Sequence, residues 1–318
     1  MTTSARHRAP ASGFTLIELM VSITLAMLLL IAAMTFFLTS RQSYASIGDT
    51  TQIEDKGQFA LDVVVRLIRQ SAWENWAPRN GGARVGITGD MNAAPNIFGL
   101  DNCAAPTASL QPACEQVGVA GSDMLQVRFV GSGRSDDPTL PDNTMVDCSG
   151  MGVGEPAPEN VDDGRGVAQF FVATGSNNVP ELFCQFRVRD AQGRETDAWR
   201  RVSLVKGVES LHFLYGIDGN NDRVPDQFVP ATAIGAITEA NWKRVVAVKV
   251  SMVIRGDNAS TEPASDTAFS LFGPSYSNAQ DPGSGTYTPT TNLQSQRRQF
   301  SASIQLRNAP VCSPMPCP

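Results

Sequence analysis

A short acidic loop carries oxygen-bearing side chains at alternate positions, the pattern by which calcium loops aim their ligands inward. Residues 218–226 read DGNNDRVPD. The candidate ligands, four side chains and one backbone carbonyl, are Asp218, Asn220, Asp222, Asp226 and Val224. The loop has Arg223 where an EF-hand has its glycine, and Val229 where it has its bidentate glutamate. The pattern therefore predicts either a weak calcium site or an ordinary polar turn, because Asp, Asn and Gly also favour turns.

The cysteines fit a disulfide framework better than a metal cluster. The six are Cys103, Cys114, Cys148, Cys184, Cys312 and Cys317. None of them has the C-x-x-C spacing of a zinc site, and histidine occurs only at His7 and His212. An even number of cysteines in an oxidising compartment indicates disulfides. Six cysteines can pair in many ways, and counting alone does not choose among them. We propose the sequential pairing, 103–114, 148–184 and 312–317.

Composition narrows the function further. The 318 residues have a formal charge of -6, which argues against a nucleic-acid-binding surface because such a surface needs a basic stripe. Hydrophobic residues make up 42% and charged residues 18%, as in a folded protein. A serine-histidine-aspartate site would have to use His212, which alternates with Leu211 and Phe213 as in a strand. We interpret His212 as a packed or surface residue, so the case for an enzyme rests only on scattered carboxylates.

The chain begins with a segment that predicts a membrane anchor. Residues 14–38 form a 25-residue apolar run whose single charge is Glu18. As a helix this run would span about 37 Å, more than the bilayer core, and it is too long for a cleaved signal peptide. Arg6 and Arg8 precede it, which predicts a cytoplasmic N-terminus and an external C-terminal part. A carboxylate at membrane depth is costly, so Glu18 is a functional candidate that needs a partner.

Helix breakers are absent from one long stretch and frequent afterwards. Pro10 and Pro78 bracket 67 residues without proline, which predicts one long N-terminal helix. Beyond residue 40 the helix becomes amphipathic, and Gly48 and Gly57 mark weak points that each cost about 1 kcal/mol relative to alanine. The apolar face, on which a sheet would pack, consists of Ile53, Ala60, Leu61, Val64, Leu67 and Ile68.

The remainder of the chain alternates as half-buried strands do. The predicted strands cover residues 125–129, 182–189, 208–215, 246–254 and 300–306. Long Gly-, Asn-, Asp- and Pro-rich loops lie between them, notably 131–166 and 256–297. The sequence thus predicts an α+β fold in which the long N-terminal helix packs on an antiparallel β-sheet with long, disulfide-bearing loops.

The residues at the start of the anchor resemble a known signature. Gly13-Phe14-Thr15-Leu16-Ile17-Glu18 and the apolar run behind it resemble the prepilin signature of type IV pilins and type II secretion pseudopilins. The resemblance implies that a prepilin peptidase cuts after Gly13 and that Phe14 becomes the N-methylated first residue. It also implies that Glu18 is an assembly residue that meets the new amino group of a neighbouring subunit, because a paired buried charge is tolerable. The implied segments are a leader (1–13), a transmembrane or filament-core helix (14–39), an amphipathic helix (40–77) and a periplasmic or extracellular β-rich domain (78–318).

Shorter blocks resemble the PilW-type minor pilins and stand in the order of that family. They are RQSY at 41–44, GQFALD at 57–62, GSDML at 121–125, GVESL at 207–211, YGID at 215–218, WKRVVAV at 242–248 and residues 300–308. The resemblance implies a structural subunit without catalytic activity in the priming or tip complex of a type IV pilus. Its implied partners are other minor pilins, the major pilin and a PilY-type tip adhesin, with roles in adhesion and twitching motility. It implies a single-pass inner-membrane protein, with its N-terminus in the cytoplasm, that later joins the extracellular pilus.

Two alternatives stay open at this level. A minor pseudopilin of a type II secretion system would share the same N-terminal signature and the same membrane anchor. A pilus-borne adhesin or receptor would bind its ligand through the loops 131–166 and 256–297.

Overall fold

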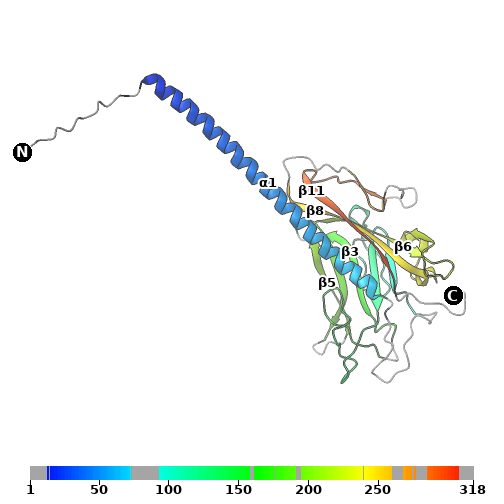
Figure 1. The fold of residues 1–318 in the computed structure, drawn as a ribbon. Helices are drawn as coiled ribbons and strands as arrows, with labels where there is room; N and C mark the ends of the chain where they lie inside the picture. Colours follow the sequence, from blue (N-terminus) through cyan, green and yellow to red (C-terminus); the bar gives the residue numbers. More distant parts are fainter. Residues whose placement is uncertain are drawn as a thin grey trace, which may run out of the picture. The chain divides into compact units, whose positions relative to one another are not determined.

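The computed structural model describes residues 13, 15–71, 73, 93–157, 161–175, 177–190, 195–238, 240–259, 268–273, 276 and 285–307. The chain divides into two compact units, Met1–Gly48 and Asp49–Pro318. The first unit contains the beginning of helix α1 (Leu16–Gln70), and the second contains the rest of α1 and every described strand (Figure 1). We call the second unit the head.

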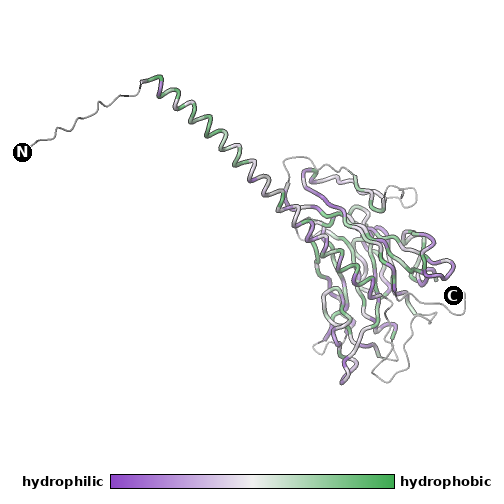
Figure 2. Tube along the Cα trace, viewed as in Figure 1, coloured by the Kyte–Doolittle hydropathy of each residue, from purple (hydrophilic) through white to green (hydrophobic). Residues whose placement is uncertain are grey.

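In the first unit, residues 16–38 of α1 are apolar apart from Glu18 and a few hydroxyl side chains. All of its large hydrophobic side chains from Leu16 to Leu38 are 47–77% exposed, and this part of the helix is drawn largely in green in Figure 2. The stretch Leu16–Arg41 is long and apolar enough to cross a membrane. Its hydroxyl groups donate to backbone carbonyls three or four residues earlier, which satisfies them inside the helix. These donors are Ser22, Thr24, Thr35 and Thr39.

Within the head, α1 buries the apolar stripe that the sequence predicts. The buried residues are Ile53, Ala60, Val63, Val64, Leu67 and Ile68, and they share one core with the strands. Leu61 is partly buried against the same core. The helix ends at Gln70, earlier than the predicted residue 77, where the hydroxyl of Ser71 bonds the carbonyl of Ile68 at 2.6 Å. Residue 72 and residues 74–92 lie outside the described part of the chain.

A five-stranded antiparallel sheet forms one half of the head. Its strands, in spatial order, are β1 (Ile97–Leu100), β2 (Met124–Phe129), β3 (Gly166–Thr174), β4 (Pro180–Arg189) and β5 (Glu195–Lys206). The strands predicted at residues 125–129 and 182–189 are confirmed as β2 and β4. The sequence did not predict β1, β3 or β5.

A second antiparallel sheet has the order β11-β8-β6-β7. Its strands are β6 (Val208–Ile217), β7 (Gln227–Val229), β8 (Val245–Ala259) and β11 (Ser295–Gln305). The strands predicted at 208–215, 246–254 and 300–306 are confirmed as β6, β8 and β11. The prediction of one sheet was wrong, because the described strands form two large sheets and a two-stranded one, β9 (Phe269–Ser270) with β10 (Thr286–Tyr287).

The predicted loop 256–297 is partly ordered as strands. It contains the end of β8, both strands of the small sheet and the start of β11. Three short helices complete the described structure: η2 (Val119–Gly121), α2 (Ala231–Ile234) and η3 (Ala240–Arg244). Trp242 of η3 is buried, with its ring centroid 5.0 Å from that of Phe98 on β1 and 4.9 Å from that of Tyr215 on β6. These aromatic contacts join the two large sheets.

A buried ladder of glutamines fixes the register of the central strands. Gln169 on β3 lies opposite Gln126 on β2 and Gln185 on β4. The amide of Gln169 donates to Gln126 at 2.8 Å and accepts from Gln185 at 3.0 Å. Gln126 and Gln169 also donate to the carbonyls of Leu110 and Ser109, at 3.1 and 2.8 Å. A shift by one residue would turn these amides to the other face, so the ladder specifies one register.

Candidate functional site

The first turn of α1 is closed by a reciprocal pair of hydrogen bonds between Thr15 and Glu18. The carboxylate oxygen Oε2 of Glu18 accepts from the backbone N–H and from the hydroxyl of Thr15, both at 3.0 Å. The backbone N–H of Glu18 lies 3.4 Å from the Thr15 hydroxyl oxygen, to which it donates. This arrangement is a capping box, which satisfies N–H groups that the helix itself leaves without partners.

Thr15 is the site residue that the sequence analysis missed. The signal was available, because Thr15-Leu16-Ile17-Glu18 has the S/T-x-x-E spacing of a capping box. The capping box places the single acid of the apolar helix at the positive end of the helix dipole, where a carboxylate is favoured. Both hydrogen bonds from Thr15 to the Glu18 carboxylate use Oε2.

The predicted cleavage site is only partly described. Gly13 is exposed and has no heavy atom within 4 Å of a Cβ built on it. Phe14, the predicted methylated residue, lies outside the described residues. Cleavage and methylation therefore stay predictions at this level.

The acidic loop between β6 and β7 is bonded mainly to itself. Asp218 is buried, and its carboxylate accepts from the backbone N–H groups of Asn220 at 3.1 Å, of Asn221 at 2.6 Å and of Arg223 at 2.8 Å. Asn221 and Arg223 have positive φ angles of 64° and 68°, which the loop must hold in place. The Asp222 carboxylate accepts in the same way from the N–H of Val224, one of the predicted calcium ligands, at 2.7 Å.

As the loop stands, a hydrogen-bond donor occupies the place that a cation would need. The amide nitrogen of Asn220 lies 3.2 Å from Asp222 Oδ2 and 3.4 Å from Asp226 Oδ1, so a donor stands between the two carboxylates. The other Asp226 oxygen accepts from the N–H of Gly219 at 2.6 Å. Among the described residues, no group of three or more His, Cys, Asp or Glu side chains has the arrangement of a metal site. The loop is a polar turn as it stands, and calcium binding stays a prediction.

Two of the three proposed disulfides are confirmed. Cys103 pairs with Cys114, with 5.6 Å between their Cα atoms, and Cys148 pairs with Cys184, with 6.4 Å between theirs. Cys312 and Cys317 lie outside the described residues, so their pairing stays a prediction.

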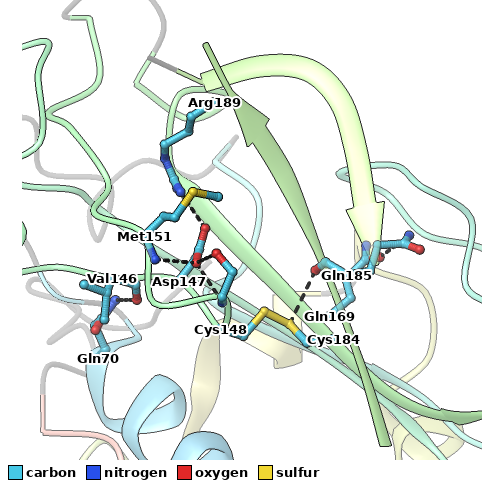
Figure 3. The surroundings of a disulfide bond; sticks show 10 residues. Gln70, Val146, Asp147, Cys148, Met151, Gln169, Cys184, Gln185 and Arg189 are labelled. Atoms are coloured by element: carbon cyan, nitrogen blue, oxygen red, sulfur yellow. Dashed lines mark hydrogen bonds and ion pairs between the residues drawn. A yellow bond between two sulfur atoms is a disulfide. The ribbon is translucent and has the colours of Figure 1, made fainter. Parts of the chain in front are cut away.

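The second disulfide belongs to a larger anchor for the predicted loop 131–166 (Figure 3). Next to Cys148, the buried Asp147 forms an ion pair with Arg189 on β4, with 2.5 Å between Oδ2 and Nη1. The other Asp147 oxygen accepts from Ser149 and from the N–H of Met151 at 3.2 Å. Gln70, the last residue of α1, donates to the carbonyl of Val146 at 2.9 Å. This part of the loop is therefore fixed to both α1 and β4.

His212 is confirmed as a packed residue. It is fully buried on β6, and its Nδ1 lies 3.2 Å from Oδ2 of the buried Asp123. The Asp123 carboxylate also accepts from the backbone N–H groups of Phe213 at 3.0 Å and of Asn102 at 3.1 Å. Asp123 precedes β2, so this one carboxylate ties the five-stranded sheet to β6 of the other sheet. The contact gives Asp123, the acid of the GSDML block, a structural role. It does not indicate catalysis.

Comparison with known proteins supports the interpretation of both parts of the chain. Residues 169–308, which run from within β3 to just beyond β11, match the family described as Type IV Pilus-assembly protein W. Residues 8–34 match the prokaryotic N-terminal methylation motif. No curated protein sequence gives a significant match. The chain is also similar to a solved structure, the type IV-like pilin TTHA1219 from Thermus thermophilus, with 12% identity, a TM-score of 0.39, and coverage of 81% of this chain and 98% of that one.

The motif match falls on the prepilin signature, and the PilW match covers four of the seven PilW-like blocks. The blocks at 41–44, 57–62 and 121–125 lie outside it. The methylation motif covers Gly13, Phe14 and Glu18 and continues into the apolar helix. The W-family match covers most of the head, including β4 to β11. The two sequence matches therefore support a PilW-type pilin that carries the prepilin N-terminal motif.

Proposed function

We propose that this protein is a minor pilin that acts in the priming or tip complex from which a type IV pilus assembles. The observation that carries the proposal is an apolar helix, Leu16–Arg41, whose large side chains are exposed and whose one acid stands in its first turn. A single chain gains nothing from such a surface in water, whereas a membrane or a bundle of like helices would bury it.

Glu18 would act as the residue that docks one subunit to the next. Before assembly, Thr15 supplies the hydrogen bonds that make the carboxylate tolerable at the end of an apolar helix. After a prepilin peptidase cuts behind Gly13, the new amino group of Phe14 on a neighbouring subunit can approach the same carboxylate. Once such an ion pair lies between packed apolar helices, removing either partner strongly destabilises the assembly, because the remaining charge would be buried alone.

The proposed cellular arrangement follows from the charges around the anchor. Arg6 and Arg8 hold the N-terminus in the cytoplasm, and α1 spans the inner membrane until the subunit enters the extracellular pilus. The head then faces the other minor pilins, the major pilin and a PilY-type tip adhesin, in support of adhesion and twitching motility. We assign the chain no catalytic activity and no nucleic-acid ligand, since members of pilin families serve as structural subunits.

A change at Glu18 tests the assembly role directly. The full-length Glu18→Val variant, expressed in a host that lacks its own copy, should still lose its leader but should fall by about tenfold or more in sheared pili. A tenfold loss corresponds to a difference of roughly 1.4 kcal/mol in the free energy of assembly. This is a modest part of the free-energy cost of leaving a buried charge unpaired. Asp62→Val is the matched control, because Asp62 is an exposed acid on the head portion of α1.

Immunoblots of the pilus and membrane fractions give the readout. Full incorporation of Glu18→Val, with the control unchanged, would contradict the docking role. If the wild-type protein is found only in a secretion pseudopilus and never in a surface pilus, the type II secretion alternative is correct.

A further inference from the structure

Strand β5 forms an open edge of the five-stranded sheet. It runs for 12 residues, from Glu195 to Lys206, and pairs with β4 on one side (Figure 1). Side chains of β5 also contact β4, as in the hydrogen bond from the Ser203 hydroxyl to Glu181. Among the described strands, none pairs with its other side, so the outer N–H and C=O groups of β5 are available to a partner.

The remaining edges of the two large sheets offer much less. β1 and β7 are only four and three residues long. β11 is long, but it is held along α1 by an ion pair between Arg298 and Glu54 at 2.6 Å and by a hydrogen bond between Thr50 and Gln296 at 2.8 Å. β5 is therefore the longest edge strand of the two large sheets among the described strands.

The middle of β5 has the regularity that an added strand requires. Irregularities in the register against β4 occur near both ends of β5, and between them Trp199 to Ser203 pair regularly with residues 183–187. Proteins usually protect long edges with charged side chains, proline or bulges. This regular stretch reads WRRVS, so its two arginines are its protection, and an acidic strand could neutralise them.

Two arginines in this stretch have no acidic partner among the described residues. Arg200 is exposed, and Arg201 makes only a cation–π contact, 5.6 Å above the ring of Phe183. The arginines of the neighbouring strand are paired: Arg189 with Asp147 at 2.5 Å, and Arg187 with two acids of β5. The sheet therefore neutralises the arginines of β4 within itself and leaves those of β5 for an external anion.

We propose that the Trp199–Ser203 edge of β5 accepts an added strand from a partner subunit, and that this strand carries acidic residues opposite Arg200 and Arg201. Successive residues of a strand point to opposite faces, so the partner segment needs an acid on each face, which means adjacent acids in its sequence. A second copy of this chain is a poor occupant, because antiparallel pairing centred on these residues would place arginine opposite arginine. The partner is thus an extended, acidic segment of a different protein.

The inference rests on the proposed assembly role, which brings the head next to other subunits. It concerns the head alone and does not require that Glu18 be the docking residue. A photo-crosslinking amino acid, p-benzoylphenylalanine, placed at the exposed Ala198 or Ser203 of the full-length chain probes the edge in cells. We expect an adduct whose cross-linked peptide maps to an extended segment with adjacent acids.

Two kinds of variant make the test specific. The double reversal Arg200→Glu with Arg201→Glu should lower the adduct yield by about tenfold or more, because like charges would face each other. Arg307→Glu is the control, since Arg307 is exposed and lies beyond β11. N–H groups alternate between the two sides of a strand, so either Arg200→Pro or Arg201→Pro keeps the ladder to β4 while it blocks the outer edge. The proline variant that retains the wild-type melting temperature should also lose the adduct.

Several results would overturn the inference. They are an adduct with a second copy of this chain, an adduct that persists in the double reversal or in the stable proline variant, and the absence of any adduct from wild-type chains recovered in pili. Wild-type chains that never reach pili would instead count against the proposed assembly role. The two failures are therefore distinguishable.

Discussion

The ring of Phe300 on β11 lies directly against the backbone of Gly57 on α1. A Cβ built on Gly57 would stand 2.1 Å from Cζ of Phe300, well inside van der Waals contact. Phe300 is only 6% exposed and belongs to the main core, so its ring has little room to move. Gly57 is therefore the position that lets β11 approach the helix, and the sequence-based view of it as a weak point was incomplete.

Gly57→Ala should destabilise the head even though alanine is the better helix former. The overpacking against Phe300 costs about 1–3 kcal/mol, which exceeds the gain of about 1 kcal/mol in helix propensity. Urea unfolding of the detergent-solubilised full-length chain, followed by tryptophan fluorescence, measures the free energy of unfolding.

Gly48→Ala is the matched control for that change. Gly48 is also within α1, but no heavy atom lies within 4 Å of a Cβ built there. It should leave the free energy of unfolding unchanged or raise it by less than about 1 kcal/mol. Equal effects of the two substitutions would show that the contact with Phe300 does not determine the role of Gly57.

Asp123→Ala should be among the most damaging single changes in the head. It removes the acceptor of the Phe213 and Asn102 N–H groups and the partner of His212, and the contacts to Phe213 and His212 are fully buried. We expect a loss of roughly 3 kcal/mol or more in the free energy of unfolding. Asp197→Ala removes a fully exposed acid paired with Arg187 and should stay within about 0.5 kcal/mol of wild type. A loss below about 1 kcal/mol for Asp123→Ala would refute its role as the tie between the sheets.

Stability should fall as Asp101 ionises. Burial, followed by the negative charge of Asp123, raises the pKa of Asp101 from 3.8 to about 6, although its carboxylate accepts from the N–H groups of Ala231 and Thr232. The folded state thus holds this proton more tightly than the unfolded state does. The resulting stabilisation is complete below about pH 4 and is lost as the pH rises through about 6. Relative to Asp101→Asn, wild type should lose unfolding free energy between about pH 4 and about pH 8, and parallel curves for the two proteins would contradict the raised pKa.

Asp218→Ala should destabilise the β6–β7 loop without any metal. Its carboxylate is the acceptor for three backbone N–H groups, two of them on residues with positive φ. We expect a loss of about 1–3 kcal/mol in the free energy of unfolding, measured in a chelating buffer. Asp136→Ala, at an exposed acid of the 131–166 loop, should have a much smaller effect. A loss no larger than that of the control would mean that the loop does not depend on Asp218.

The proposed calcium site is tested separately on the wild-type chain. Millimolar calcium should raise its melting temperature, and the double variant Asp218→Ala with Asp222→Ala should abolish that rise. The ion would displace the Asn220 amide from between Asp222 and Asp226. A wild-type melting temperature that is indifferent to calcium would leave the loop as a polar turn.

The sequence predicted strands in which apolar and polar residues alternate clearly, and it missed β3 and β5, in which they do not. β2 and β11 alternate between apolar and polar residues, so periodicity finds them. β3 reads GVAQFFVAT and is buried on both faces over its first seven residues, so it has no alternation to detect. β5 fails for the opposite reason, because it is a polar, mostly exposed edge with register irregularities.

The residues of the sites divide in a similar way. Glu18 and the cysteines are unusual for their surroundings in the sequence, and for that reason they were predicted. Thr15 was readable from local spacing alone, since its partner is three residues away. Asp123 and Gly57 act through residues 90 and 243 positions later, and only the tertiary fold brings those partners together.

The N-terminus of the chain in assembled pili tests the central claim most directly. Mass spectrometry of the N-terminal peptide, from protein sheared off the cell surface, identifies both the first residue and its modification. Processing after Gly13 predicts a peptide that begins with N-methylated Phe14. A peptide that begins with Met1, or with any residue other than Phe14, would contradict the account of this protein as a processed pilin subunit.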